Sequence, residues 1–286
     1  MAGKALLDYQ GSMQGDDTGV SMSEKNAFFS ELTGIYWVWK NTRQDITGSC
    51  HYRRYFTGQS EPFDLKLKRI LYFLAGLNKK RCGLIYTANV SRFQKRILTA
   101  REIVELFHTY DAILPQRRKF RYSVKRHYER YHHSGDLKRI RKILEVKYPD
   151  YLDSFDKIMN GRRLYANNMF ILPDVHFQKF MKWWFSVLFD FEKSLQTEDY
   201  QGYQQRIFGF IGERLLNVWF LHEQLKVKEL PVIYFKKLKK SEGKKGRGAR
   251  ISEKRKRETR IRKNYETKHL FCPHSKKCRK QHAGNL

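Results

Sequence analysis

The stretch DITGSCHYRRYF, residues 45–56, decides the fold. Its first part, DITGS, is short and mildly apolar, as in a β-strand, and its second part, CHYRRYF, holds one His, two Arg and three aromatic rings. The preceding segment, residues 26–41, has its large apolar side chains at helical spacing: Phe29, Leu32, Tyr36 and Trp39. A helix followed by a strand and a charged loop is the alternation of an α/β domain.

Similar patterns follow downstream. TARE, residues 99–102, is a capping box that predicts a helix ending near Tyr110, and DAILP, residues 111–115, predicts a buried strand. LYANNMFILP, residues 164–173, predicts another buried strand, and VIYF, residues 232–235, predicts an edge strand. The remaining long patterns predict a helical C-terminal half, with helices over 122–160, 176–195 and 203–225.

The formal net charge of +29 is unevenly distributed. Residues 236–286 carry 20 Lys and Arg against 4 Asp and Glu, a net of +16, and residues 1–235 carry 38 against 25, a net of +13. The last fifth of the chain also has few large apolar residues, so it cannot bury enough surface to offset its ordering entropy. We therefore predict a folded domain over 1–235 and a basic, mostly disordered tail over 236–286. Such a tail binds polyanions, including RNA and anionic lipid headgroups.

The sequence contains no apolar run long enough for a membrane span and no export-signal pattern at its N-terminus. Its four cysteines are therefore expected to be reduced thiols in a cytoplasm: Cys50, Cys82, Cys272 and Cys278. Cys272, Cys278 and His282 have spacings found in part of a zinc-binding module, but they fit no closed tetrahedral motif.

The run CHYRRYF is the first candidate binding site. If it is extended, His51 and Arg53 point to one face and Arg54 points to the other. A guanidinium group suits phosphate oxygens, and the end of a strand is where open α/β sheets bind ligands. The run CHYRRYF therefore has three interpretations: a pocket for a small phosphorylated ligand, a nucleic-acid groove, or an exposed strand end with solvated arginines.

Acidic and amide residues supply further candidates. Asp16 and Asp17 lie in a Gly-flanked loop that could hold a divalent ion or accept sugar hydroxyls, or could be a simple turn. There is no Asp-x-Asp triplet, so dependence on a divalent cation such as Mn or Mg is left open. Asn168, in a predicted buried strand, needs a partner for its amide. Glu213 in an apolar helix is either a general base or a solvated partner of the next residue, Arg214.

Five blocks of the chain, in order, resemble blocks of the DUF4422 family. They are DDTGVSMSEKNAFFSELTGIYWVWKN, DITGSCHYRRYF, YDAILPQRR, YANNMFILP and FGFIGERLLNVW, within about residues 2–235. The resemblance implies an α/β fold of the GT-A type, a Rossmann-type sheet that binds a nucleotide sugar and is flanked by helices. It also implies a bacterial hexosyltransferase of capsular and exopolysaccharide biosynthesis.

In that family setting, the sugar is galactose or galactofuranose, and it passes from a UDP-sugar donor to a lipid-linked oligosaccharide. The reaction would take place in the cytoplasm, at the inner face of the plasma membrane, with the basic tail on anionic lipid. Family members usually begin with an extra strand and loop, which implies a clipped chain with reduced or no activity. There are two alternatives to a transferase. One is a nucleic-acid-binding protein with a basic aromatic surface, and the other is an inactive scaffold of a polysaccharide-assembly complex. If the chain is a transferase, we expect it to bind no specific nucleic acid.

The matching blocks also select site residues, to which we assign roles. Glu213 and Asp17 are the predicted catalytic residues, with Glu213 as the base for the acceptor hydroxyl. Asp16 and Asp17 are placed at the donor sugar, its ribose or an ion, while His51, Arg53 and Arg54 neutralise the departing diphosphate. The other predicted donor-binding residues are Lys25, Asn26, Asn168 and Arg214. The matching blocks also select Glu31, to which we assign no role.

Overall fold

The computed structural model describes residues 2–7, 12–75, 84–195 and 199–236. The predicted tail and the cluster of Cys272, Cys278 and His282 lie outside these residues, apart from position 236. The described residues belong to one compact unit.

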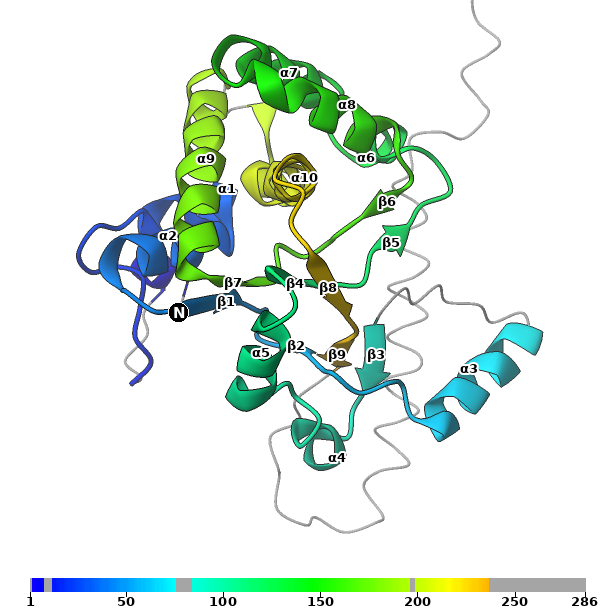
Figure 1. Cartoon of the computed structure of the whole chain (residues 1–286). Helices are drawn as coiled ribbons and strands as arrows, with labels where there is room; N and C mark the ends of the chain where they lie inside the picture. The colour runs from blue at the N-terminus through cyan, green and yellow to red at the C-terminus, as the bar shows by residue number, and fades with distance from the viewer. Residues whose placement is uncertain (1, 8–11, 76–83, 196–198, 237–286) are drawn as a thin grey trace, which may run out of the picture. The chain divides into compact units, whose positions relative to one another are not determined.

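The strands of the described residues form three sheets (Figure 1), with the orders β1-β7-β4-β8, β2-β9-β3 and β5-β6. Their bounds are β1 (Ile46–Ser49), β2 (Arg54–Phe56), β3 (Leu84–Thr87), β4 (Ala112–Pro115), β5 (Arg118–Lys119), β6 (Arg163–Leu164), β7 (Phe170–Pro173), β8 (Val227–Leu230) and β9 (Val232–Phe235).

Both larger sheets are mixed. In the first, β7 runs antiparallel to β1 and β4, and β8 runs parallel to β4. In the second, β9 lies between β2, to which it is antiparallel, and β3, to which it is parallel. The prediction of an edge strand for VIYF was therefore wrong. Val232, Ile233 and Phe235 are all buried, and a nearly continuous apolar run is typical of a strand covered on both faces.

The helices fall into an N-terminal pair, three helices between residues 63 and 107, and a helical C-terminal half. The α-helices are α1 (Asn26–Phe29), α2 (Leu32–Asn41), α3 (Phe63–Leu74), α4 (Val90–Gln94), α5 (Ala100–Phe107), α6 (Val124–Tyr131), α7 (Gly135–Lys147), α8 (Leu152–Asn160), α9 (Asp174–Lys193) and α10 (Ile207–His222). Short 3-10 helices are η1 (Lys4–Leu6), η2 (Ser23–Lys25), η3 (Pro149–Tyr151) and η5 (Gly202–Arg206).

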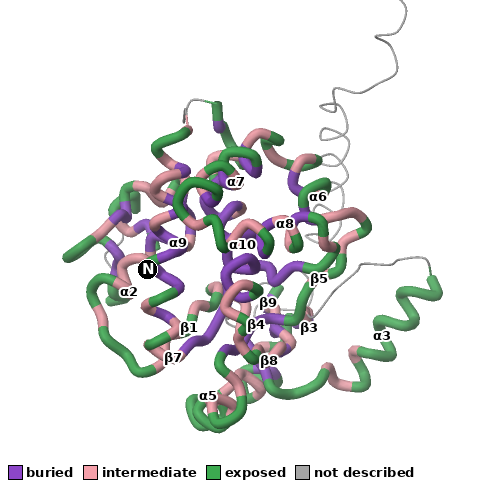
Figure 2. The backbone as a smooth tube through the Cα atoms, turned by 45° about the horizontal axis from the view of Figure 1, so that its top comes forward, coloured by how far each residue is buried: buried purple, intermediate pink, exposed green. Residues whose placement is uncertain are grey.

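The core is built around α10. This helix is apolar on nearly every side, which is typical of a helix enclosed by others, and it packs against α1, α8 and α9. Figure 2 shows it buried along most of its length, whereas α3 is exposed. The α/β prediction and the helical C-terminal half are confirmed, as is the capping box, in which Thr99 and Glu102 bond each other's backbone N–H.

Two predicted elements are interrupted. The helix over 26–41 is broken at Ser30, whose φ is 54°, and the strand over 164–173 is broken by a turn at Asn167 and Asn168, with φ of 80° and 48°. Asn tolerates the left-handed region because its short amide can bond nearby backbone. Both interruptions lie beside the cavities described below.

Phe180 of α9 is fully buried and contacts the rings of Trp184 and Trp219, at centroid distances of 4.7 and 4.9 Å. We expect Phe180→Ala to lower the free energy of unfolding by about 3–5 kcal/mol, because it leaves a cavity between α9 and α10. Denaturant unfolding followed by circular dichroism measures this. Val175→Ala, at an exposed position of the same helix, is the control, and an equal loss in both variants would contradict the packing described.

Candidate functional site

Ser30 sets the position of Glu31. The backbone of Ser30, with φ 54° and ψ −130°, separates α1 from α2 and turns the chain between them. Asn26 secures this turn, since its Nδ2 donates to the Ser30 carbonyl oxygen at 2.6 Å and to Thr33 Oγ1 at 3.0 Å. The kink therefore fixes the direction in which the next side chain, Glu31, leaves the helix.

The turn between β6 and β7 supplies the second support. Asn168 is 1% exposed, and its Nδ2 donates to Glu31 Oε1 at 2.9 Å and to the Gly209 carbonyl at 3.0 Å. The backbone N–H of Asn167 donates to Glu213 Oε1 at 2.7 Å. One turn thus orients two carboxylates, one from the α1–α2 kink and one from α10.

Two adjoining cavities are walled by these residues. The smaller, which we call the polar cleft, has a volume of about 310 Å³. It contains four guanidinium groups and two carboxylates among its lining residues: Glu31, His51, Arg54, Arg118, His127, His132, Asn167, Tyr203, Arg206, Gly209, Phe210, Glu213 and Arg214. These charges leave the cleft with an excess of two positive charges, which suits a dianionic group such as a diphosphate.

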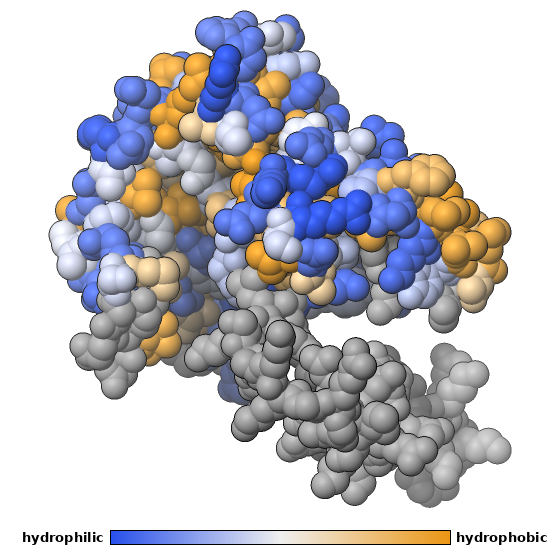
Figure 3. All heavy atoms as spheres, turned by 90° about the horizontal axis from the view of Figure 1, so that it is seen from below, coloured by the Kyte–Doolittle hydropathy of each residue, from blue (hydrophilic) through white to orange (hydrophobic). Residues whose placement is uncertain are grey.

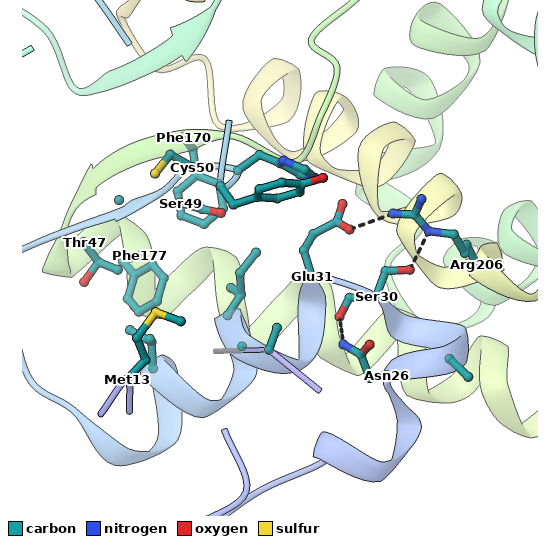
Figure 4. Close-up of a pocket in the computed structure, with 18 residues that line it drawn as sticks. Met13, Asn26, Ser30, Glu31, Thr47, Ser49, Cys50, Phe170, Phe177 and Arg206 are labelled. Carbon is teal, nitrogen blue, oxygen red and sulfur yellow. Dashed lines mark hydrogen bonds and ion pairs between the residues drawn. The ribbon is translucent and has the colours of Figure 1, made fainter. Parts of the chain in front are cut away.

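The larger cavity, of about 840 Å³, is mostly apolar (Figure 4). Val38, Phe170 and Phe177 contribute to its walls, and the strand residues Thr47 to Cys50 lie along it. It shares Glu31, His51 and Arg206 with the polar cleft, so the two cavities meet at these side chains.

Arg206 holds the junction together. Its Nε donates to Ser30 Oγ at 2.9 Å, and its Nη2 lies 3.4 Å from Glu31 Oε2. Figure 4 shows both interactions at the rim of the larger cavity, with Glu31 directed toward Arg206. Glu31 therefore faces both cavities while it is hydrogen-bonded by Asn168 and Arg206.

Several buried nitrogens at the polar cleft are unpaired. Among the described residues, no hydrogen-bond partner is found for the Nε atoms of Arg54 and Arg214 or for the Nδ1 atoms of His51 and His127. A buried donor without a partner costs roughly 1–3 kcal/mol, and native structures contain few of them. Four of the nine buried side-chain atoms without a partner among the described residues thus belong to residues that line this one cavity, which favours a ligand rich in acceptor oxygens there.

The histidines of the cleft are shifted toward their neutral forms. Burial lowers the pKa of His51, and the charge of Arg54 lowers it further while Glu31 opposes the change. Burial also lowers the pKa of His127, with added effects of Arg214 and Arg118. The neutral rings can still donate one hydrogen bond each, without adding a further positive charge.

The structure brings part of the predicted site together. His51, Arg54, Glu213 and Arg214 line the polar cleft, and Asn26 lines the larger cavity. Asn168 donates a hydrogen bond to Glu31. Its burial was expected from the sequence, although it lies in a turn and not in a strand.

Five predicted residues line neither cavity: Asp16, Asp17, Lys25, Arg53 and Asn168. Asp16 is buried and accepts hydrogen bonds from the backbone N–H groups of Gly3 and Lys4 and from the hydroxyl group of Ser23. Burial by itself would raise the pKa of the Asp16 carboxyl group, but these hydrogen bonds lower the pKa below its ordinary value. Asp17 lies 3.5 Å from the amine of Lys4. These contacts tie the N-terminal segment to the body.

Lys25 and Arg53 have other partners. Lys25 forms an ion pair with Glu192 of α9 at 2.8 Å. Arg53 bonds the hydroxyl of Tyr52 and lies over the rings of Tyr52 and Tyr234, away from the cleft. Tyr52 and Arg53 lie in a turn, closed by a hydrogen bond from the Arg54 N–H to the His51 carbonyl at 2.8 Å. The predicted alternation was therefore wrong, because His51 and Arg54, expected on opposite faces, both line the cleft, whereas Arg53 does not.

Sequence reasoning missed four cationic or histidine residues of the cleft: Arg118, His127, His132 and Arg206. Arg118 belongs to the basic run QRRKFR that follows the strand DAILP, so its position after a strand was an available signal. The other three belong to helical segments whose sequences contain nothing that distinguishes them from solvated surface residues.

A divalent cation does not fit the residues of this cleft. The two carboxylates, Glu31 and Glu213, each interact with an arginine, and guanidinium groups outnumber them. Within the described ranges there is also no group of three or more His, Cys, Asp or Glu side chains able to hold a metal ion. Positive charge at the cleft comes from arginine side chains.

Comparison with protein families finds a match over residues 1–224 to a family described as a domain of unknown function, DUF4422. The chain belongs to the DUF4422 family. The family identified from the five sequence blocks is thereby confirmed. No curated protein matches the sequence.

Among solved structures, the apo structure of the bifunctional glycosyltransferase WbbM is similar to this DUF4422 chain. The two share 29% sequence identity with a TM-score of 0.72, over 82% of this chain and 41% of the WbbM chain. The chain thus spans less than half of WbbM, and the α/β fold predicted for it matches that of part of a glycosyltransferase. None of the helices in the described part of the chain is long and apolar enough to span a membrane.

We expect His51 and His127 to titrate below the ordinary pKa of 6.5 in the folded protein, because burial and nearby arginines disfavour the imidazolium form. NMR of the histidine ring resonances against pH measures this, with His51→Asn and His127→Asn variants for assignment. Since the unfolded chain binds more protons below pH 6.5, these groups lower stability as the pH falls through that value. Titration at or above 6.5 would contradict the burial described.

Proposed function

We propose that this chain is a glycosyltransferase whose polar cleft binds the diphosphate of a nucleotide sugar. The observation that carries the proposal is the convergence of four guanidinium groups, with unpaired buried nitrogens on Arg54 and Arg214, in one cavity. The similarity to a bifunctional glycosyltransferase supports the same class of reaction. A concave site of about 310 Å³ favours a small phosphorylated ligand over the nucleic-acid groove that the sequence left open.

The adjoining cavity is the proposed site of the nucleoside. Its apolar walls, with Phe177 and Val38, suit the faces of a base and a ribose, and polar groups at its junction with the cleft fix the orientation. Because the cavities meet at His51, Glu31 and Arg206, a diphosphate in the cleft would be continuous with a nucleoside in the larger cavity.

The proposed reaction breaks the bond between the anomeric carbon and the diphosphate oxygen. The electron pair leaves with the diphosphate, and the increased negative charge is stabilised by Arg54, Arg118 and Arg206. The acceptor hydroxyl oxygen forms the new bond to the anomeric carbon and loses its proton to a carboxylate. In this scheme, the arginines provide the charge stabilisation for the leaving group.

Glu213 is the proposed base. Its backbone-bonded oxygen, Oε1, is fixed by Asn167, and Oε2 lies 3.2 Å from Arg214. Glu31 is the second carboxylate of the cleft and is bonded on both oxygens by neutral or cationic donors. We assign Glu31 to positioning, because it joins the kink, the turn and Arg206.

The finer identity of the substrates follows from the family resemblance. We propose a UDP-sugar donor, with galactose or galactofuranose as the sugar, and a lipid-linked oligosaccharide acceptor in capsule or exopolysaccharide biosynthesis. The reaction would then take place at the inner face of the plasma membrane.

Arg54→Ala tests the diphosphate assignment. We expect it to weaken UDP binding by roughly 10- to 100-fold, because an ionic hydrogen bond contributes about 1.5–3 kcal/mol. Arg53→Ala, one residue away and outside both cavities, should leave the affinity within about twofold. Isothermal titration calorimetry of the full chain provides both values. Equal effects of the two substitutions would contradict the assignment.

Glu213→Gln tests the base. Removing a general base is expected to lower kcat by about 10²- to 10⁴-fold with little change in the KM for the donor, since the amide still accepts from Asn167. Mass spectrometry of transfer from a panel of UDP-sugars to lipid-linked acceptor identifies the donor and then measures the rate. Glu223→Gln, at the end of the same helix, is the control. An unchanged kcat in Glu213→Gln would remove Glu213 from the mechanism.

A further inference from the structure

Helix α3 (Phe63–Leu74) is an exposed helix with no buried residue. Its large apolar side chains remain accessible, with Phe63 78% and Leu74 74% exposed. Large apolar side chains gathered on one exposed helix are uncommon in a protein surface that faces only water. Figure 3 shows an apolar area, in orange, on the side of the molecule where α3 lies, next to hydrophilic atoms in blue.

Five of the exposed apolar residues share one face of the helix, while Tyr72 and Phe73, also exposed, lie outside it. Phe63, Leu67, Ile70, Leu71 and Leu74 follow the spacing i, i+4, i+7, i+8 and i+11, which is a single stripe on a helix with 3.6 residues per turn. Each of the five is exposed. Residues 66–75 are exposed on every side, so the stripe is accessible along the helix.

The first turn of α3 is attached to the domain. Leu65 packs against the core cluster of the second sheet, and Asp64 forms two hydrogen bonds with the guanidinium group of Arg92 of α4, at 2.8 and 2.9 Å. Glu61, just before the helix, forms an ion pair with Arg69 at 3.1 Å. These contacts hold the N-terminal end of the helix against the domain.

The surroundings of the stripe are basic. The described residues of 61–75 and 84–96 include six Lys and Arg and two acidic residues, Glu61 and Asp64. Both acidic residues are already paired with arginines. Lys66 and Lys68, on α3 itself, lie at the two sides of the apolar stripe by helical periodicity and are exposed.

We infer that α3 docks on an anionic lipid surface. An apolar stripe flanked by lysines suits a helix that lies in the plane of a bilayer interface, with apolar side chains among the acyl chains and amines at the headgroups. Anionic headgroups complement the excess of positive charge around the helix. The docking surface is defined by Phe63, Leu67, Ile70, Leu71 and Leu74, and it includes no residue of the basic segment 236–286. It does not depend on the proposed sugar transfer.

The test is vesicle binding by the full chain, with equal parts of phosphatidylglycerol and phosphatidylcholine. We expect the double variant Leu67→Asn, Leu71→Asn to bind roughly tenfold or more weakly in cosedimentation, because two apolar side chains no longer enter the bilayer. The control is Val104→Asn, Val146→Asn, which changes exposed valines of α5 and α7 and should bind like the unchanged protein. Vesicles of phosphatidylcholine alone should bind more weakly than the anionic ones.

Hydrogen exchange of the unchanged protein gives an independent measurement. Anionic vesicles should slow exchange of backbone amides in residues 63–75. Slowing confined to residues 237–286, or equal vesicle binding by the α3 variant, would overturn the inference. So would a change in oligomeric state in the α3 variant with vesicle binding unaltered, because the stripe would then be an interface between copies. Circular dichroism of each variant checks that the fold is retained.

Discussion

The hydrogen bonds of Asn168 connect the parts on which the candidate site depends. Its buried amide bonds Glu31 at the α1–α2 kink and the Gly209 carbonyl in α10, while Asn167, beside it, bonds Glu213. Three segments distant in sequence are thus joined at one turn. Loss of this amide would leave the Glu31 carboxylate with one fewer donor in a partly buried position, and such a loss costs roughly 1–3 kcal/mol.

Backbone strain is concentrated at the same place. Of the four non-glycine residues with positive φ in the described part of the chain, Ser30, Asn167 and Asn168 adjoin the two cavities. Such conformations cost about 1–3 kcal/mol each and persist where the surrounding structure enforces them. Here that enforcement comes from hydrogen bonds of Asn26, Arg206 and Asn168. The strain fixes the direction of Glu31, which supports a binding role for the residues around it.

Local signals in the sequence predicted local structure well. The capping box of Thr99 and Glu102 forms because its partners are three residues apart. Alternation failed at residues 51–54, because a turn at Tyr52 and Arg53 brings His51 and Arg54 to the same cleft. Which of the two arginines faces a cavity depends on the packing of β2 against β9, which local patterns do not encode. Arg206 is held at the site by contacts with Ser30 and Glu31, about 175 residues earlier in the chain. The central position of β9 was missed for the same reason, since it depends on two partner strands distant in the sequence.

The central claim is that the guanidinium groups of the polar cleft bind the diphosphate of a nucleotide sugar. A crystal structure of the full chain with UDP tests this most directly. The account predicts phosphate oxygens within hydrogen-bond distance of Arg54 and Arg118, with the base in the larger cavity and His51 near the junction. Phosphates bound by Arg53 and not by Arg54, or at no position in the cleft, would contradict it.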